Sequence, residues 1–378
     1  MTKVMTVVGT RPEIIRLSRV ISRLDQTVDH VLVHTGQNWD HMLSDVFFDE
    51  LELRKPDRFL GVDTSSLGRV LGGVLAGVEE AIKEERPDAL LVLGDTNSCI
   101  AALMARRMKV PVYHMEAGNR CFDLNVPEET NRRMVDHVSD FNLVYTEHAR
   151  RNLLAEGLHP RRIMHTGSPM REVLDHYRPK IDASKVLDKL SLEADGYFLV
   201  SAHREENVDD PERLGQLLDC LRAVRDRWNL PVLVSTHPRT RKRLEERADD
   251  PGSLENIVFH EPFGFFDYVH LQMKAKCTLS DSGTISEESA ILGFPAVTLR
   301  DSIERPEALD NGTILMTGLE ATGVVEALEV IANRPANASV PEDYTVTNTS
   351  ERVARFLLST VRRHHFWQGI RVAKHDPA

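Results

Sequence analysis

The sequence of 378 residues lacks the features that mark several classes of protein. It contains no run of about 18 apolar residues, so no membrane-spanning helix is expected. The N-terminal "MTKVMTVVGTRPE" has no basic stretch followed by an apolar stretch and a cleavage site, so we expect a cytoplasmic protein. The few cysteines are scattered without a CxxC spacing, which suits a reducing compartment: Cys99, Cys121, Cys220 and Cys277.

Acidic residues outnumber basic ones, and the common metal-ligand motifs are absent from the sequence. The chain has 47 Lys and Arg against 58 Asp and Glu, a net charge of −11. This balance argues against a nucleic-acid partner, although local arginines can still bind a small anion. The histidines are dispersed, with no HExxH or clustered HxH motif, so no metal is expected.

Short β-branched runs alternate with longer helical patterns along the whole chain. We expect six strands in each half, over 3–10, 30–36, 89–96, 110–117, 141–148 and 162–169, then 197–204, 231–238, 256–262, 277–283, 295–301 and 312–318. Nearly continuous apolar strands separated by amphipathic helices predict parallel sheets covered on both faces. The fold class is therefore α/β, with two doubly wound domains.

The domain boundary is expected near residue 170. We expect an N-terminal domain over 1–170 and a C-terminal domain over 171–349, with a linker in "SPMREVLDHYRPKIDASK", where Pro169 and Pro179 disfavour helix. A last helix over about 350–378, capped by Ser350, is expected to pack back on the first domain.

Most of these strands end in polar, chemically competent residues. In open parallel sheets, ligands bind outside the carboxyl ends of the strands. Two such sheets that face each other would aim both sets of residues into one cleft between the domains.

The junction "GTRPEIIRLSRVI" predicts an anion site at a helix N-terminus. Thr10 can cap the helix, Pro12 suits its first turn, and Arg11 and Arg16 add positive charge. The alternative is a capped helix with a solvated arginine. The junction matches neither GxGxxG nor GxxxxGK[ST], so a dinucleotide or Walker-type site lacks its fingerprint.

The junction "LSDSGTISEESAILGFP" predicts a second anion site. Ser282, Gly283 and Thr284 open a helix whose N–H groups can bind phosphate. Thr284 and Glu287 also have the spacing of a capping box. Both interpretations can hold, with Glu287 capping and Glu288 accepting hydrogen bonds from a ribose.

Further cations follow other strands. Arg305 and Glu307 flank Pro306 in an expected loop, where Arg305 is either a bidentate phosphate partner or half of a surface ion pair. His203 and Arg204 end one strand, and His237 with Arg239 repeats that pattern. A histidine there is either structural or a group that titrates near neutrality.

The carboxylate candidates are Asp95, Glu116 and Glu128. The first two end strands, and "PEETNR" is expected to start a helix on which Glu128 pairs with Arg132. The alternative is a salt-bridged helix start. Carboxylates grouped at one edge push each other's pKa values apart, which yields an acid and a base.

At these residues the chain resembles the non-hydrolysing UDP-N-acetylglucosamine 2-epimerases. The motifs "GTRPE", "GDT", "EAGNR", "PEE.NR", "HRE", "DSG…EE" and "ERPEA" occur in that family's order across about residues 3 to 370. The resemblance implies two Rossmann-like domains in the glycosyltransferase-B arrangement, facing across a cleft, and a homodimer. It also implies interconversion of UDP-GlcNAc and UDP-ManNAc, through loss and re-addition of UDP, without metal or nicotinamide.

The resemblance also implies a role for each candidate residue. Asp95, Glu116 and Glu128 would carry the acid/base chemistry, and His203 would stabilise the leaving diphosphate. The expected substrate-binding set is Arg11, Arg16, Arg132, Arg204, His237, Ser282, Gly283, Thr284, Glu288 and Arg305, with Glu288 on the ribose.

Three departures from the family pattern bear on function. Arg16 stands where many members have lysine. Asn38 and Asp40 stand where regulated bacterial members carry histidine and glutamine, so we expect hyperbolic kinetics without activation by UDP-GlcNAc. "AGNRCFD" replaces the commoner "AGLRTGD" and resembles epimerases of modified sugars, such as UDP-2,3-diacetamido-glucuronate.

The alternatives to this function are three. A glycosyltransferase would share "DSG…EE" but need not retain three acids in the first half. A hydrolysing epimerase would differ only in whether water or UDP captures the intermediate. A nucleotide-sugar sensor would need the binding residues but not the acids.

Overall fold

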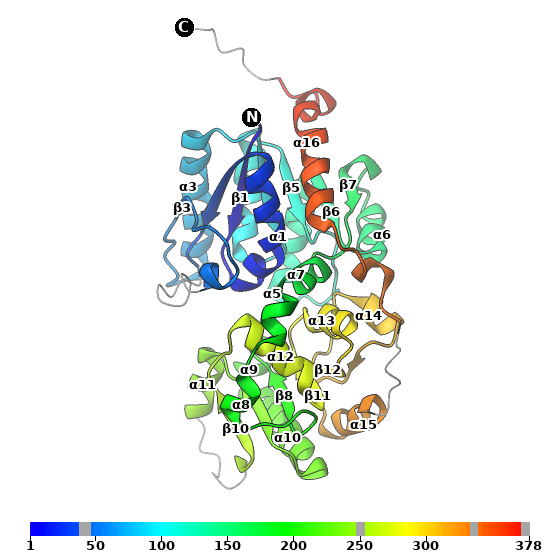
Figure 1. The fold of residues 1–378 in the computed structure, drawn as a ribbon. Helices are drawn as coiled ribbons and strands as arrows, with labels where there is room; N and C mark the ends of the chain where they lie inside the picture. Colours follow the sequence, from blue (N-terminus) through cyan, green and yellow to red (C-terminus); the bar gives the residue numbers. More distant parts are fainter. Residues whose placement is uncertain (38–46, 247–253, 333–338, 372–378) are drawn as a thin grey trace. The chain divides into compact units, whose positions relative to one another are not determined.

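A computed structural model describes residues 1–37, 47–246, 254–332 and 339–371 of the chain (Figure 1). The chain divides into two compact units. Unit 1 comprises Met1–Arg120, Val126–Val173 and Val346–Ala378, and unit 2 comprises Cys121–Asn125 and Leu174–Thr345. Each unit is built on one parallel sheet with helical connections, so the prediction of two doubly wound α/β domains is confirmed.

The sheet of unit 1 has seven strands in the order β3-β2-β1-β4-β5-β6-β7. The strands are β1 (Lys3–Val8), β2 (Asp29–His34), β3 (Arg58–Phe59), β4 (Ala89–Leu93), β5 (Val112–Met115), β6 (Phe141–Val144) and β7 (Ile163–His165). All neighbours pair in parallel. The six predicted strands are present. Sequence analysis missed β3 because two residues carry no readable alternation of apolar and polar positions.

The sheet of unit 2 has six strands in the order β10-β9-β8-β11-β12-β13. The strands are β8 (Phe198–Ser201), β9 (Val232–Ser235), β10 (Ile257–His260), β11 (Cys277–Ser280), β12 (Ala296–Thr298) and β13 (Leu315–Met316). All pairs are again parallel, and all six strands were predicted.

Helices connect the strands of each unit. In unit 1 they are α1 (Arg11–Thr27), α3 (Leu67–Glu85), η1 (Asn97–Ile100), α4 (Ala101–Arg107), α5 (Pro127–Val138), α6 (Glu147–Ala155), η2 (Pro160–Arg162) and α16 (Thr349–Trp367). In unit 2 they are α8 (Val186–Leu190), α9 (Glu205–Val208), α10 (Pro211–Trp228), α11 (Pro238–Glu245), α12 (Phe265–Lys274), α13 (Ile285–Leu292), α14 (Pro306–Asp310), α15 (Ala321–Ala332) and η4 (Glu342–Tyr344).

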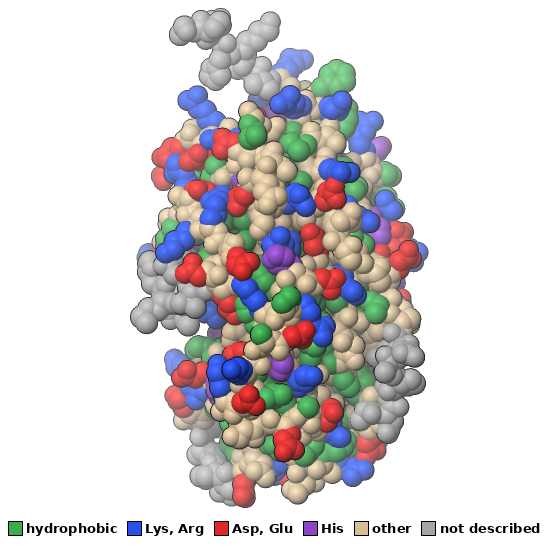
Figure 2. All heavy atoms as spheres, viewed as in Figure 1, with side chains coloured by type: hydrophobic (Ala, Val, Ile, Leu, Met, Phe, Trp, Pro, Cys, Tyr) green, Lys and Arg blue, Asp and Glu red, His purple; other side chains and the backbone are tan. Residues whose placement is uncertain are grey.

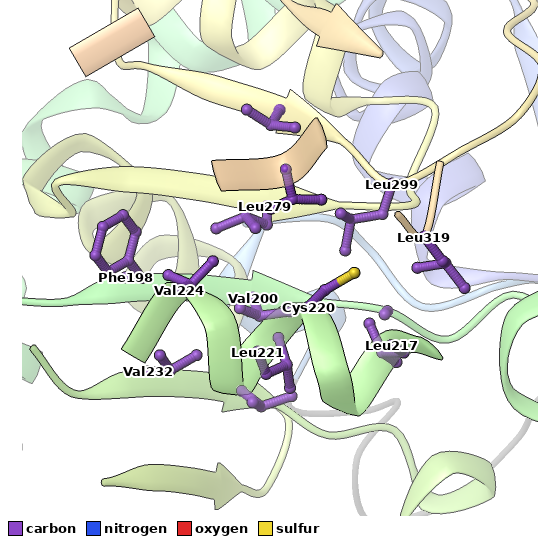
Figure 3. Close-up of a cluster of buried hydrophobic side chains, with 14 of the residues drawn as sticks. Phe198, Val200, Leu217, Cys220, Leu221, Val224, Val232, Leu279, Leu299 and Leu319 are labelled. Carbon is purple, nitrogen blue, oxygen red and sulfur yellow. The ribbon is translucent and has the colours of Figure 1, made fainter. Parts of the chain in front are cut away.

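Apolar side chains of strand and helix fill the space between each sheet and its helices. In unit 2, Phe198 and Val200 of β8 meet Leu217, Leu221 and Val224 of α10 (Figure 3). Fully burying a side chain of this size stabilises a fold by about 1.5–3 kcal/mol. The sheet of unit 1 has an equivalent apolar cluster against α3 and α4.

The expected linker is a helix. α7 (Met170–Asp182) contains Pro179 and crosses the boundary between the units at Val173 and Leu174. The prediction that Pro179 disfavours helix here is wrong. Pro169 precedes the helix, and burial of Val173, Leu174, Tyr177 and Ile181 at helical spacing outweighs the hydrogen bond that Pro179 cannot donate.

The last helix, α16, packs against α1 in unit 1. Its N-cap is Asn348, so the prediction that Ser350 caps the helix is wrong. Ser350 lies inside the first turn instead, where its backbone N–H donates to Glu172 Oε2 at 2.8 Å.

Acidic and basic side chains intermix over the face shown in Figure 2. Among the described helices, none is long and apolar enough to cross a membrane.

In each sheet the strand order reverses beside the first strand of the unit. These switch points lie between β1 and β4 in unit 1, and between β8 and β11 in unit 2. The carboxyl ends of the strands at a switch point diverge in their connections and leave the crevice where such folds bind ligands. The predicted site residues follow these strands.

Candidate active site

In unit 1, Glu13 joins the turns after β1 and β4. It is buried, and its Oε2 accepts the N–H groups of Gly9 and Thr10 at 2.7 Å each. Its Oε1 accepts from Thr96 Oγ1 at 2.9 Å. Burial raises the pKa of Glu13, and these hydrogen bonds oppose the rise. Sequence analysis missed Glu13, although Thr10 and Glu13 have the spacing of a capping box.

Capping explains much of the "GTRPE" junction. Thr10 is the N-cap of α1, and Glu13 already occupies backbone donors that an anion would use. Arg11, at the start of α1, is partly buried, and its guanidinium carbon lies 5.8 Å from the ring centroid of Phe47. It therefore projects beside the turn without being fully solvated.

Glu116 is held in an unusual position at the end of β5. It has φ +64°, in the left-handed region that non-glycine residues seldom adopt, and its side chain is only 8% exposed. Arg16 of α1 is also buried, and its Nη1 forms an ion pair with Glu116 Oε2. The pair joins two predicted site residues that are separated by 100 positions in the sequence.

Asp95 follows β4 and contacts a second buried arginine. Its Oδ2 accepts from Arg132 Nε at 2.9 Å and lies 2.6 Å from Arg132 Nη2. Arg132 Nη1 also donates to Glu129 Oε2 at 3.1 Å. The helix start is therefore salt-bridged through Glu129, a fully buried residue that sequence analysis did not single out.

Glu128 lies in the first turn of α5 and is partly buried. The same helix places the Nδ2 of Asn131 2.9 Å from the carbonyl oxygen of Asp95. The first turns of α5 thus lie beside the end of β4, and β4 neighbours β5, which ends at Glu116. Unit 1 brings Asp95, Glu116 and the helix turn that carries Glu128 to one edge of its sheet.

In unit 2 a buried aspartate organises the switch point. Asp281 is fully buried and its Oδ2 accepts from the backbone N–H groups of His203 and Arg204 at 3.0 Å each. It also accepts from Asn207 Nδ2 at 3.1 Å. Sequence analysis did not single out Asp281, which it included only in the expected strand over 277–283. Asp281 lies between the end of β11 and Ser282, and this position in the sequence could have indicated that it holds the neighbouring strand end in place.

Two histidine rings lie beside this switch point. The exposed rings of His203 and His237 have centroids 6.0 Å apart. His237 is also the N-cap of α11, where its Nδ1 accepts the N–H of Arg239 at 3.2 Å. His203 Nδ1 lies 3.6 Å from Asp281 Oδ1, so the imidazole ring has a buried carboxylate beside it.

The Ser282 turn opens α13. Ser282 Oγ and Thr284 Oγ1 lie 3.0 Å apart, and all three turn residues are partly accessible. Thr284 makes no capping side-chain hydrogen bond, and Glu287 is buried 3.1 Å from Arg305 Nε. The prediction that Glu287 caps the helix is therefore wrong, because an ion pair claims its carboxylate. Glu288 accepts from Gln272 Nε2 at 2.7 Å.

Arg305 belongs to a buried ion cluster. It is the N-cap of α14 and is 3% exposed, so the alternative of a surface ion pair is wrong. Burial favours a lower pKa of Arg305, but Glu287 and Glu304 outweigh burial, and the pKa is raised. Glu304 also pairs with Arg300 and lies 3.5 Å from Arg204 Nη2.

This cluster explains why residue 283 is glycine. A Cβ atom at Gly283 would lie 2.5 Å from Glu304 Oε1 and 2.6 Å from Arg305 Nη1. The turn therefore packs directly on the ion cluster, and its backbone N–H groups are positioned by that packing.

Among the described residues, no group of three His, Cys, Asp or Glu side chains has the arrangement of a metal site. Asn38 and Asp40, from which hyperbolic kinetics is predicted, lie outside the described residues.

Comparison with known proteins makes the relationship specific. Residues 22–358 match the model of the family described as UDP-N-acetylglucosamine 2-epimerase. The structure is similar to that of UDP-N-acetylglucosamine 2-epimerase from Rickettsia bellii, with 47% sequence identity, a TM-score of 0.89, and 97% of this chain and 98% of that chain covered. It is equally similar, at TM-score 0.89 and 35% identity, to Methanocaldococcus jannaschii UDP-GlcNAc 2-epimerase in complex with UDP-GlcNAc and UDP, covering 95% of this chain and 100% of that chain.

A curated relative has a different named substrate. UDP-2,3-diacetamido-2,3-dideoxy-D-glucuronate 2-epimerase of Pseudomonas aeruginosa is 33% identical over 364 residues, which cover 94% of this chain and 99% of the relative.

Carboxylates follow β4 and β5 of unit 1, and a histidine, an arginine and a helix-opening serine turn follow β8 and β11 of unit 2, which together with these comparisons identifies an enzyme of nucleotide-sugar chemistry. The chain belongs to the UDP-N-acetylglucosamine 2-epimerase family and is an isomerase. The predicted family and epimerase function are confirmed.

Proposed function

We propose that the chain interconverts UDP-GlcNAc and UDP-ManNAc by elimination and re-addition of UDP. The observation that carries this proposal is the pairing of two strand-end carboxylates with buried arginines in unit 1. Asp95 contacts Arg132, and Glu116 contacts Arg16. A nucleotide-sugar sensor would have no use for carboxylates placed in this way.

The chemistry explains the need for several acids. The hydrogen on C2 of the sugar is not acidic, so the proton leaves as the bond from C1 to the diphosphate oxygen breaks, which gives a 2-acetamidoglucal and UDP. UDP then re-forms the bond to C1 while a proton is added to the opposite face of C2. The two faces require one group that accepts a proton and another that donates one. We propose that Asp95, Glu116 and Glu128 share these two tasks.

The residues of unit 2 suit the departing UDP. We propose that His203 and Arg204 stabilise the charge that develops on the diphosphate, and that the turn of Ser282, Gly283 and Thr284 donates hydrogen bonds to it. Asp281 supports this role because it fixes the backbone of both His203 and Arg204. Glu288 is proposed to accept hydrogen bonds from the ribose.

Proton NMR of UDP-GlcNAc with the enzyme in deuterated water tests the proposal. We expect deuterium at C2, a second UDP-sugar and little free UDP. Asp95→Asn, Glu116→Gln and Glu128→Gln should each lose most of the exchange, by about 10²-fold to 10⁴-fold. Full exchange in all three variants, or none in the wild type, would contradict the mechanism. Free UDP with free sugar as the main products would instead identify a hydrolysing epimerase.

A modified UDP-amino sugar is the second candidate substrate. The loop "AGNRCFD" departs from the commoner pattern, and the relative from Pseudomonas aeruginosa is nearly as similar in sequence as that from Methanocaldococcus jannaschii, at 33% against 35%. Measuring kcat/KM for UDP-GlcNAc and for the UDP-2,3-diacetamido-glucuronate sugar decides between them. The better substrate is the one with the higher value.

We also propose a homodimer that works in the cytoplasm. The outer face of α3 supports the dimer, because Leu67, Gly68, Gly72 and Ala76 are all exposed on it in the single chain. Small residues let a second helix approach closely. The four cysteines are buried and form no disulfide with one another, which suits a reducing compartment, and cell fractionation tests that location.

A further inference from the structure

Asp136 is a buried carboxylate that the proposed chemistry does not use. It lies on α5 and is 0% exposed. Its Oδ1 lies 2.9 Å from His114 Nδ1, and its Oδ2 accepts from Arg120 Nη1 at 2.7 Å. Both oxygens also accept the backbone N–H of Gly118, at 3.2 and 3.1 Å. Asp136 therefore contacts the chain on both sides of Glu116.

The second ring nitrogen of His114 extends this network to β4. His114 Nε2 lies 2.8 Å from the carbonyl oxygen of Gly94, the residue before Asp95. Both ring nitrogens thus lie within hydrogen-bonding distance of an oxygen, one on Asp136 and the other on Gly94. Asp136 and His114 together join the turn that carries Glu116 to the turn that carries Asp95.

The conformation of the Glu116 turn needs such support. Glu116 has φ +64°, and a left-handed backbone at a non-glycine residue costs about 1–3 kcal/mol. Gly118 follows at φ +82°, and a Cβ there would lie 2.4 Å from the carbonyl oxygen of Ala149. The backbone at Gly118 is therefore packed closely against Ala149. The N–H of Gly118 donates to Asp136.

Three charged residues of α5 are spaced so that they lie on the same face of the helix. Glu128, Arg132 and Asp136 are four residues apart, so all three side chains lie on one side of the helix. Glu128 is a proposed acid/base group, Arg132 contacts Asp95, and Asp136 holds the Glu116 turn. One helix therefore carries one carboxylate and fixes the other two.

We propose that Asp136 and His114 are positioning residues, which set the separation between Asp95 and Glu116 for proton transfer at C2. This inference rests on the proposed epimerase function. Neither residue needs to touch the sugar. Their effect acts on the chemical step because a displacement of about 1 Å at a reacting group costs about 10²-fold in rate.

The test compares Asp136→Asn with a matched buried aspartate. Asp140 is 1% exposed, accepts the N–H of Val112 at 3.0 Å, pairs with Arg106 and lies 2.7 Å from His364 Nε2. It has the same kinds of partner as Asp136, but at the opposite end of β5. Asp140→Asn therefore reproduces the loss of a buried carboxylate without touching the acid-bearing turns.

For Asp136→Asn we expect kcat per folded molecule, measured as C2 deuterium exchange, to fall by about 10²-fold. KM should stay at the wild-type value, because the hydrogen-bond partners of Asp136 are His114, Gly118, Arg120 and Asn142, none of which is a predicted substrate-binding residue. The rise in melting temperature produced by UDP should also stay unchanged, because the residues proposed to hold the departing UDP lie in unit 2. Asp140→Asn should lose stability but keep kcat.

Two variants of His114 serve if Asp136→Asn does not fold. The Nδ2 of asparagine can replace His114 Nδ1 and keep the bond to Asp136, whereas the Nε2 of glutamine can replace His114 Nε2 and keep the bond to Gly94. Each variant cuts one half of the link, so both His114→Asn and His114→Gln should lose kcat with KM unchanged.

Two outcomes would overturn the proposal in different ways. If the wild type exchanges C2 hydrogen and the Asp136 and His114 variants lose no more kcat than Asp140→Asn, the network is only structural. If the wild type leaves the C2 hydrogen in place, the epimerase mechanism fails, and the positioning role fails with it.

Discussion

At the scale of single residues, buried arginines decide how the carboxylates of unit 1 are held. Arg16 and Glu116 are both less than a tenth exposed, so neither charge has water as its main partner. Removing one partner of such a pair leaves a buried charge without its counter-ion, which costs more than the pair itself contributes.

Arg16→Met should lower the free energy of unfolding by about 3–5 kcal/mol, because it leaves the Glu116 carboxylate buried without this cation. Arg16→Lys keeps the charge and should lose less. Urea denaturation measures both. The double variant with Glu116→Gln should be more stable than the sum of the single losses. Simple additivity would show that the two side chains do not interact.

His34, at the end of β2, is expected to make the free energy of unfolding depend on pH. Burial lowers the pKa of its imidazole from 6.5 to about 4, and its Nδ1 accepts the N–H of Gly36 at 3.0 Å, which requires the unprotonated nitrogen. Between pH 6.5 and 4 His34 binds a proton in the unfolded chain but stays unprotonated in the folded protein. The contribution of His34 to the free energy of unfolding is therefore fully present above pH 6.5, the pKa in the unfolded chain. It is lost as the pH falls from 6.5 toward 4.

His34→Asn removes the titration, since an amide oxygen can accept from Gly36 without changing charge. The stability of the wild type relative to this variant should fall by up to about 1.4 kcal/mol per pH unit between pH 6.5 and 4. Urea unfolding across that range measures the difference. A difference that stays constant with pH would show that His34 is not buried in its neutral form.

At the scale of elements, burial outweighs local preference. α7 forms through Pro179 because its apolar side chains lie on one face. α16 is attached to unit 1 by both its packing and its first turn, where Glu172 of α7 accepts from the N–H and the hydroxyl of Ser350.

Glu172→Ala should destabilise the start of α16 by about 1 kcal/mol, as does the loss of other side chains that satisfy first-turn N–H groups. Hydrogen exchange of the α16 amides and urea unfolding measure this effect. Glu351→Ala is the matched control, since Glu351 lies on the same helix and pairs only near the surface with Arg355 at 2.5 Å. Equal losses in the two variants would argue against a capping role for Glu172.

At the scale of the whole molecule, the sheets of the two units have equivalent strand orders but carry different functional residues at their carboxyl ends. Carboxylates follow β4 and β5 in unit 1, whereas histidine, arginine and the Ser282 turn follow β8 and β11 in unit 2. The proposed dimer can be tested by a substitution on the exposed face of α3.

Gly72→Glu should convert the proposed dimer to a monomer, because it places a charge in the middle of the exposed α3 face. The monomer fold should tolerate the change, since a Cβ at Gly72 meets no atom within 4 Å. Light scattering after gel filtration measures the mass. Val330→Glu on α15, at a position 67% exposed, adds the same charge elsewhere and should leave the mass unchanged. A wild type with the mass of one chain would refute the dimer.

Local sequence patterns were enough to predict the fold class, the order of the strands along the chain and the residues that end them. These follow from local patterns: apolar runs, helical periodicity and turn residues such as Gly94 and Gly118. The side-chain partners of these residues could be identified only from the three-dimensional structure. In it, Arg132 contacts Asp95, Glu287 contacts Arg305, and Asp136 accepts from the N–H of Gly118. Ion pairs between residues far apart in the chain depend on how sheets and helices pack, and no local spacing encodes that geometry.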